Sequence, residues 1–321
     1  MRTTGRLALL LAALASLLAC GCRSQKERVT FVGPMKLAGQ EVPADLLNEG
    51  REDYVQYCYA CHGMEGNGKG PAARYYRPPP RDLTRGLYKF GGVVDGLPHD
   101  EDFVRILRHG LKGTPMLAWD IPDGELYPII QYIKTLSESW QEEQPGTRIP
   151  VDTDTWKGKE VEAIARGQKI YHGLATCQQC HAAYITKQEI YEASKEVGPS
   201  ALVQFRPDLY QPEPKESEYR ADGRKLRILP PDFLFNKVRS GREVVDLYRI
   251  ISAGIPGTSM PTWFNALKVE DVWAMAYYVQ SLIDMQGKPA AFALRQRLAS
   301  QPAFVPPPPA APAGASRARE R

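Results

Sequence analysis

Two five-residue stretches carry most of the information in this chain: CYACH at residues 58–62 and CQQCH at residues 177–181. Both follow the pattern Cys-x-x-Cys-His. The gap of two residues brings both sulfurs within one turn of helix, and the histidine follows the second sulfur directly. The chain has 6 cysteines, so only Cys20 and Cys22 lie outside the two motifs and none is left for a structural disulfide within the fold.

This pattern is the attachment signature of a c-type haem. Two copies predict two covalently bound haems, each with one iron. The expected thioether bonds to the haem vinyl groups come from Cys58 and Cys61 in the first motif and from Cys177 and Cys180 in the second. The adjacent histidines, His62 and His181, are the expected axial ligands. The four thiols could instead form one tetrahedral zinc site, but the histidine after each pair favours haem.

The features around the two motifs repeat in the same order, which indicates an internal duplication. In each half a Gly…Tyr segment precedes the motif, a Gly-Pro pair follows it, a Gly-Thr-x-Met loop comes later, and an apolar helical pattern closes the half. The paired segments are 50–54 with 167–171, 70–71 with 198–199, 103–116 with 247–260, and 126–136 with 269–283.

The repeated loops offer a ligand for the second face of each iron. Met116 and Met260 each end a Gly-Thr-x-Met string, and glycine lets the backbone approach a haem closely. Histidine–methionine ligation raises the reduction potential and leaves no open position for oxygen or peroxide. Axial histidines commonly donate their outer N–H to a carbonyl or carboxylate, and the carbonyls of Pro71 and Pro199 are the predicted acceptors.

Three further histidines have weaker roles. His99 lies in an Asp-rich turn and is expected to be solvated, and His172 is expected at a helix end. His109, seven residues before Met116, is an alternative ligand that could replace that methionine in one redox state.

The pattern of apolar residues predicts a helical protein. Helices are expected over 44–57, 100–109, 125–137, 159–172, 244–253 and 269–284, and no strand-like alternation is present. A proline in a helix interior costs roughly 3 kcal/mol. The first closing helix is therefore expected to begin near Pro128 or to bend there. The fold class is all-α.

The N-terminus resembles an export signal. Arg2 and Arg6 precede an apolar run that ends at Ala19 and is shorter than the ~20 residues that span a bilayer. The sequence Leu-Leu-Ala-Cys at 17–20 resembles a bacterial lipobox, which implies cleavage after residue 19 and lipidation of Cys20. Ordinary cleavage near Ala19, an uncleaved anchor, and lipidation of Cys22 are the alternatives.

The predicted division of the chain has six parts. A signal peptide at 1–19 precedes a membrane tether at 20–45, a first domain at 46–140, a linker at 141–158, a second domain at 159–286, and a Pro/Ala-rich tail at 287–321 that is expected to be disordered. The formal charge of +4 includes the signal arginines, and haem propionates offset the remainder. A near-neutral protein without a basic face gives no support for nucleic-acid binding.

The motifs and their order resemble two tandem class I cytochrome c domains, that is, a dihaem cytochrome c, over residues 46–286. Tyr54 and Tyr171 match the family's aromatic residue in the first helix, which packs against the last helix, and Tyr132 and Tyr278 are the expected partners. The resemblance implies two small helical folds, each wrapped around one haem. The long insertions in the second half depart from the family pattern, as does Pro128.

The expected function is single-electron transfer by a lipoprotein on the periplasmic side of a bacterial membrane. The expected partners are a quinol-oxidising complex and a terminal oxidase or reductase of a respiratory chain. Two alternatives remain at this stage. One is a dihaem redox enzyme, such as a peroxidase or a sulfur-compound dehydrogenase. The other is a fixed electron-entry subunit of a larger oxidoreductase.

Overall fold

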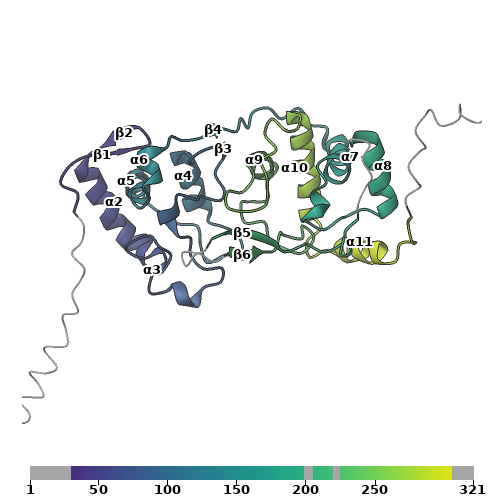
Figure 1. Ribbon diagram of the computed structural model, residues 1–321, viewed down its shortest axis with the longest axis horizontal. Helices are drawn as coiled ribbons and strands as arrows, with labels where there is room; N and C mark the ends of the chain where they lie inside the picture. Colours follow the sequence, from purple (N-terminus) through teal and green to yellow (C-terminus); the bar gives the residue numbers. More distant parts are fainter. Residues whose placement is uncertain (1–29, 199–204, 220–224, 306–321) are drawn as a thin grey trace, which may run out of the picture.

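The structure is a computed structural model that describes residues 30–198, 205–219 and 225–305. It confirms an all-α protein with few strands. Figure 1 shows two helical bodies side by side along the long axis, with the first half of the chain at one end and the second half at the other. The predicted signal peptide and Cys20 lie outside the described residues.

Within the described residues, the first body holds five α-helices, and the second holds five α-helices and one π-helical turn. The first five are α2 (Ala44–Tyr57), α3 (Tyr59–His62), α4 (Asp100–His109), α5 (Asp123–Thr135) and α6 (Ser139–Glu142). The others are α7 (Glu160–Lys169), the π-helical turn η3 (Ile170–Leu174), α8 (Lys187–Val197), α9 (Val244–Ala253), α10 (Val269–Ile283) and α11 (Pro289–Ala299). All six helices predicted from the sequence are present, with ends that differ by a few residues.

Short 3-10 turns and antiparallel two-stranded ribbons complete the described fold. The turns are η1 (Ala73–Tyr75), η2 (Leu83–Arg85) and η4 (Cys177–Gln179). The ribbons pair β1 (Met35–Leu37) with β2 (Gln40–Val42), β3 (Val93–Val94) with β4 (Thr147–Arg148), and β5 (Lys215–Tyr219) with β6 (Lys225–Ile228).

Each body is built on the crossing of its first and last long helices, α2 with α5 and α7 with α10. The helices meet where one of them carries glycine. A Cβ atom added at Gly50 would lie 1.9 Å from the carbonyl oxygen of Pro128, and one at Gly167 would lie 2.0 Å from that of Ala274. Backbone therefore touches backbone at the same place in both halves. This agreement supports the duplication and shows that Pro128 and Ala274 occupy corresponding positions in the two halves.

Pro128 lies inside α5, which begins ahead of it at Asp123. The proline is buried, and its carbonyl is the group that faces Gly50. Proline has no N–H to donate to the carbonyl four residues earlier. Helix α5 continues through Pro128 despite the missing hydrogen bond, because the proline packs at the helix crossing.

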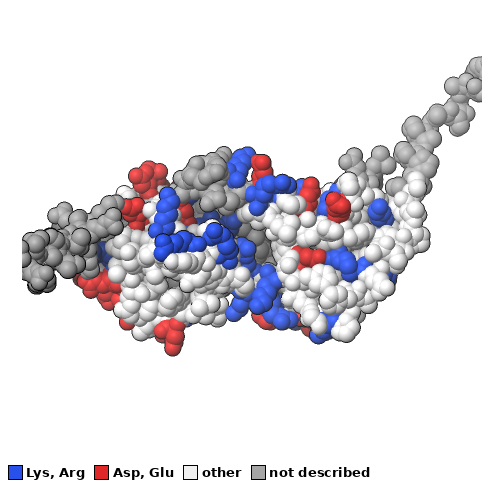
Figure 2. All heavy atoms as spheres, turned by 90° about the horizontal axis from the view of Figure 1, so that it is seen from below, with Lys and Arg blue, Asp and Glu red and all other residues white. Residues whose placement is uncertain are grey.

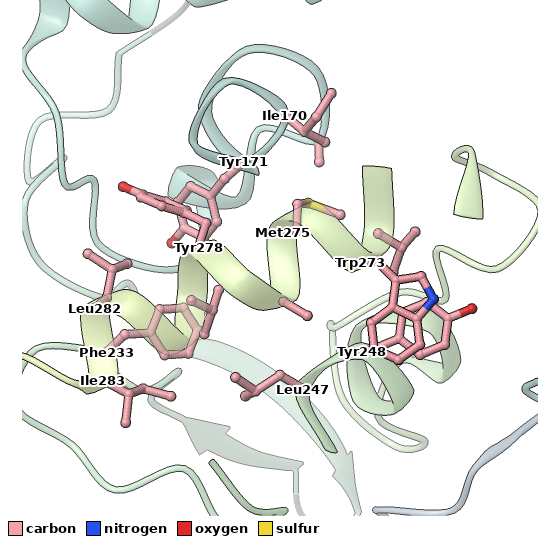
Figure 3. Packing of buried hydrophobic residues seen from close by; sticks show 14 of the residues in the cluster. Ile170, Tyr171, Phe233, Leu247, Tyr248, Trp273, Met275, Tyr278, Leu282 and Ile283 are labelled. Carbon is pink, nitrogen blue, oxygen red and sulfur yellow. The ribbon is translucent and has the colours of Figure 1, made fainter. Parts of the chain in front are cut away.

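The paired tyrosines lie just beyond the crossings, as predicted. The rings of Tyr54 and Tyr132 are 5.0 Å apart, and those of Tyr171 and Tyr278 are 5.6 Å apart in an edge-on arrangement. Figure 3 shows Tyr171 next to Tyr278 in the core of the second body, with Met275 on the same helix. Met275 is only 1% exposed, which agrees with a packing role for this methionine.

The prediction of a membrane tether over residues 20–45 is wrong for its second part, residues 35–42. Residues 35–42 form the β1–β2 hairpin, and its residues Leu37 and Val42 are each 1% exposed because they pack into the first core. The backbone N–H of Ala38 also donates to the carbonyl of Trp140 at 2.5 Å. The segment therefore belongs to the first domain.

The predicted disordered tail is wrong for residues 289–299, which form α11. Pro289 occupies the first turn, where its missing N–H costs nothing, and the alanines that follow favour a helix. Ala291 and Leu298 are buried against the second domain. Arg295 of this helix donates to the carboxylate of Asp232. The segment covers the loop that carries Asp232.

The insertion that begins at residue 182 is packed rather than loose on the surface. Ala182, Ala183 and Tyr184 are at most 1% exposed. Helix α8 follows, and a capping box between Thr186 and Glu189 fixes its start. Ile190 on this helix is fully buried. The second domain therefore has an extra layer that the first domain lacks.

The linker joins the two bodies as ordered structure. Its residues Thr147 and Arg148 pair with β3, and the N–H of Ile149 donates to the carbonyl of Gly92 at 2.9 Å. Val94 and Ile149 lie in the hydrophobic cluster of the second body. Further on, the hydroxyl of Thr153 accepts from Nε1 of Trp273 at 3.0 Å. The linker thus holds the domains together. Within the described chain, no helix has the length and apolar character to cross a membrane.

Replacing Gly50 with alanine should destabilise the first domain. The added methyl group would overlap the Pro128 carbonyl, and overpacking of a close contact costs about 1–3 kcal/mol. The measurement is denaturant unfolding of the haem-loaded protein. Gly124→Ala is the matched control, because this helical glycine has no atom within 4 Å of the added Cβ. Equal stability of the two variants would show that the helices do not meet as described.

Candidate haem-binding sites

The first motif follows α2 almost without a break. Cys58 separates α2 from α3, and α3 contains Cys61 and His62. The hydroxyl of Tyr54 donates to the carbonyl of Gly63 at 2.8 Å, which ties the core of the helix crossing to the residue after the histidine. Cys58 and Cys61 are free, partly exposed thiols. They lie one turn apart, as attachment to a single haem requires.

His62 is oriented by a carbonyl that the sequence analysis did not select. Its Nδ1 lies 3.0 Å from the carbonyl oxygen of Arg81, so Nδ1 carries the proton and donates, and Nε2 is the nitrogen left for a metal. The prediction that Pro71 supplies this acceptor is wrong. Pro71 directly follows the glycine turn. The chain returns to the imidazole of His62 only further on, at Arg81. Burial lowers the pKa of His62, which keeps the ring neutral as a ligand must be.

His181 has the same arrangement in the second half. Its Nδ1 donates to the carbonyl of Pro231 at 3.0 Å, and burial also lowers its pKa. The ring of Phe233 stacks on the imidazole at 4.8 Å with an interplanar angle of 18°, which further limits its rotation. The predicted acceptor, Pro199, lies outside the described residues, and the observed acceptor is Pro231. Both corrections have the same cause, because the acceptor loop comes later in each half.

A sequence signal for these acceptors exists in retrospect. The acceptor in each half follows a proline and precedes an aspartate and an apolar residue: Pro80-Arg81-Asp82-Leu83 and Pro230-Pro231-Asp232-Phe233. The two strings are separated from their histidines by 19 and 50 residues. This unequal spacing, caused by the insertion in the second half, hides their correspondence.

The two Gly-Thr-x-Met loops have the same geometry. The N–H of Leu111 donates to the carbonyl of Met116 at 2.8 Å, and that of Ile255 donates to the carbonyl of Met260 at 3.2 Å. In both loops the threonine hydroxyl accepts from the methionine N–H at 3.1 Å and donates to the carbonyl three residues earlier at 2.8 Å. Both methionines are half-buried. Each loop is thus a closed turn that fixes the backbone of its methionine.

Glycine is required where each methionine loop leaves the preceding helix. Gly110 after α4 and Gly254 after α9 have φ angles of +63° and +70°. A Cβ at Gly110 would lie 2.6 Å from the backbone of Leu117 and Ala118, and one at Gly254 would lie 2.7 Å from that of Pro261. The returning loop therefore packs directly on the helix end. This contact places Met116 and Met260 at corresponding positions in the two domains.

The backbone of each motif is held in a different way. In the first domain the N–H groups of Gly68 and Gly70 donate to the carbonyls of His62 and Cys61 at 2.9 and 3.1 Å. Gly68 has a φ angle of +72°, which explains the glycine-rich turn. This turn needs no side chains to satisfy the carbonyls of the motif.

In the second domain one arginine replaces the glycine turn. Arg206 donates to the carbonyls of Gln178 and His181, each at 2.7 Å. The N–H of Glu213 donates to the carbonyl of Cys180 at 2.8 Å. Arg206 and Glu213 both belong to the insertion, so the inserted chain satisfies the carbonyls of the motif that precedes it. The sequence analysis missed Arg206 because nothing in its local sequence distinguishes it from a surface arginine.

The thiols are suited to covalent attachment rather than to zinc. Burial, together with the neighbouring second cysteine of each pair, raises the pKa of Cys58 and of Cys177 to about 12. A tetrahedral zinc site would need ligands from both motifs brought together in space. Among the described residues, no three His, Cys, Asp or Glu side chains cluster closely enough to hold a metal ion. The donor set in each half, two thiols and one neutral imidazole, fits one c-type haem.

The remaining histidines have structural positions. His172 is 1% exposed; its Nδ1 donates to the carbonyl of Gln168 at 2.9 Å and its Nε2 accepts from the N–H of Tyr184 at 3.2 Å. Burial lowers its pKa to about 4, so it is a neutral core residue. His99 differs from the prediction of a solvated ring, because its Nε2 lies 2.9 Å from the carbonyl of Gly146. His109 is exposed at the end of α4.

Comparison with protein families gives one match in each half. Residues 45–133 match the family model described as cytochrome c oxidase, cbb3-type, subunit III. Residues 164–282 match the model described as cytochrome c. Each match contains one Cys-x-x-Cys-His motif and one Gly-Thr-x-Met loop.

Comparison with solved structures gives a similar chain from Kuenenia stuttgartiensis, in a structure of its reducing HAO-like protein complex. The identity is 29% and the TM-score is 0.58. The similarity covers 73% of this chain and 96% of the other chain. The arrangement of two domains therefore occurs in a component of a redox complex. Comparison with curated proteins gives no match.

Proposed function

The chain is a dihaem cytochrome c with two cytochrome c domains in tandem, and from this premise we propose that it transfers single electrons through two His/Met-ligated haems. Each haem supplies an iron that alternates between the ferric and ferrous states. The protein residues hold the haem and set its potential. The observation that carries the proposal is the duplicated methionine loop with its matching hydrogen bonds.

The proposed attachment uses the motif residues in their expected roles. Cys58 and Cys61 would hold the first haem, Cys177 and Cys180 would hold the second, and His62 and His181 would each provide an imidazole for the iron. Met116 and Met260 are the proposed ligands on the other side. Because thioether sulfur stabilises ferrous iron, this ligation raises the potential. With both axial positions filled, neither iron binds oxygen or peroxide, which argues against a peroxidase or dehydrogenase.

The proposed position in the cell follows from the N-terminal sequence. Lipidation of Cys20 would hold the protein at the periplasmic side of a bacterial membrane, since several acyl chains give stable anchoring. A carrier held there would take electrons from a quinol-oxidising complex and pass them to a terminal oxidase or reductase. The family model matched by residues 45–133 is named for an oxidase subunit, which supports a respiratory partner.

The similar chain from Kuenenia stuttgartiensis supports a second candidate function. That chain belongs to a reducing HAO-like protein complex. By analogy, the present protein would be a fixed subunit that conducts electrons into or out of a larger oxidoreductase. Both candidates use the same two haems and differ in whether the partner stays bound.

Optical spectra test the proposed ligation. The purified protein should contain two low-spin c-type haems that do not bind carbon monoxide, because both axial positions are filled. Met116→Ala or Met260→Ala should lower the potential of one haem and open that iron to carbon monoxide. Met275→Leu is the control, since Met275 lies in the core. Carbon monoxide binding by the unmodified protein would instead favour an enzyme.

Membrane fractionation tests the anchor. Cys20→Ser should release the haem-containing protein into the soluble periplasmic fraction, because the acyl chains on Cys20 are the proposed anchor. Cys22→Ser is the matched control and should leave the protein on the membrane. A Cys20→Ser protein that stays with the membrane would argue against lipidation at this residue.

Purification in high salt separates the two candidate functions. A carrier should elute alone in 1 M salt. The Debye length is then about 3 Å, so the attraction between exposed charges on the carrier and its partner is screened. A fixed subunit should keep its partner, since permanent interfaces are larger and more apolar. Size-exclusion chromatography of the solubilised protein, followed at the haem absorption, gives the answer.

A further inference from the structure

Three cationic side chains lie where the two domains meet: Arg81 and Lys89 from the first domain and Arg239 from the second. We call them the interdomain cation cluster. None of the three forms an ion pair with a carboxylate among the described residues. Figure 2 shows lysine and arginine side chains gathered across the middle of one face, between the two bodies. This gathering of like charge needs a physical reason.

Arg239 is fixed to the methionine side of the first domain. Its carbonyl accepts from the N–H of Lys112 at 3.1 Å. A Cβ added at Gly113 would lie 3.4 Å from the side chain of Lys237, so the segment 237–239 packs on the loop that ends at Met116. The second domain therefore touches the loop proposed to close the first haem site.

Arg81 lies on the histidine side of the same site, because its carbonyl orients His62. Its own charge and that of Arg239 are close enough to interact. The charges of Arg85 and Arg239 act on the Arg81 guanidinium, and Asp82 opposes them. Arg239, whose backbone contacts the methionine loop, is thus also near the residue whose carbonyl orients His62.

Lys89 completes the cluster. Burial, together with the charges of Arg81 and Arg239, lowers the pKa of Lys89 to about 8. A half-buried ammonium next to two guanidinium groups is unfavourable unless an anion compensates the charge. Asp82, the acid next to Arg81, uses its carboxylate to accept from the N–H and hydroxyl of Thr84 at 3.1 and 2.6 Å.

A haem held by Cys58, Cys61 and His62 would carry two propionate groups, which would supply the negative charge that the cluster lacks. We propose that Arg239 of the second domain, together with Arg81 and Lys89 of the first, binds the propionates of the first haem, so that the second domain completes the first haem site. Arginine suits this role, because its planar guanidinium forms two parallel hydrogen bonds with a carboxylate. The inference rests on haem attachment at the first motif and holds for a carrier and for a fixed subunit.

In this arrangement, the contact between the domains would help to set the reduction potential of the first haem. Ferric haem carries one more positive charge than ferrous haem, so a nearby cation favours the ferrous form. Arg239 belongs to the second domain but would raise the potential of the first haem. The ordered linker and the Lys112–Arg239 hydrogen bond hold the charge in place.

Spectroelectrochemical titration of Arg239→Gln in the full-length protein tests the proposal. The first haem should be harder to reduce: at a fixed ambient potential its reduced-to-oxidised ratio should fall about five- to tenfold, and tenfold corresponds to about 59 mV for one electron. The second haem should titrate unchanged. The titration step of the second haem is identified beforehand as the one that moves in Met260→Ala.

Three further variants separate charge from structure. Arg239→Lys keeps the cation and should retain most of the potential, and Lys89→Gln should lower the same step from the side of the first domain. Arg242→Gln is the matched control, because Arg242 lies in the same segment but pairs with Asp284 at 2.5 Å. An unchanged first step in Arg239→Gln, or an equal shift in Arg242→Gln, would overturn the proposal.

The haem content separates this result from a failure of the proposed function. Two haems per chain and a low-spin spectrum in each variant show that the sites are intact, so a shift in potential then reports on Arg239 alone. A wild-type protein with one haem, or with a high-spin haem, would contradict the proposed function before any variant is measured.

Discussion

The close approach of the first and last helices in each domain is the contact on which the haem sites depend. At Gly50 and Gly167 a side chain of any size would meet a carbonyl of the opposite helix. The absence of a Cβ lets the helices touch, and the tyrosines one turn further on pack against each other. Tyr54 then donates to the carbonyl of Gly63, and Tyr171 donates to that of Ala182. The helix crossing is thus linked by one hydrogen bond to the residue after each axial histidine.

The two domains hold the same imidazole geometry with different chain lengths. The carbonyl that orients the histidine comes 19 residues later in the first domain and 50 residues later in the second. The longer path is tolerated because the inserted chain supplies its own support. Arg206 binds the carbonyls of the motif, and Arg295 of α11 binds the carboxylate of Asp232 in the acceptor loop. Buried backbone carbonyls need partners, and a side chain serves as well as a glycine turn.

The contact between the domains is part of the redox machinery as we interpret it. The linker pairs with β3 and contributes Ile149 to the core of the second domain, so the two bodies share a hydrophobic cluster. The segment around Arg239 lies on the methionine loop of the first domain. A fixed arrangement of two haem domains provides a defined path for an electron, whichever partner supplies it.

The sequence by itself determined the local features: two haem-attachment motifs, a duplicated plan, the main helices, the paired tyrosines and the two methionine loops. Apart from the tyrosine pairs, which the resemblance to class I cytochrome c domains implied, each depends on residues close together in the chain, where spacing and side-chain type are sufficient. Only the tertiary structure decided which carbonyls orient His62 and His181, because Arg81 and Pro231 return to the histidines through loops of unequal length. It also decided that residues 35–42 and 289–299 are ordered, since their burial depends on surfaces formed elsewhere in the chain. The interdomain cation cluster could not be predicted for the same reason: electrostatic interaction depends on distance in space, and Arg239 is far from Arg81 in sequence.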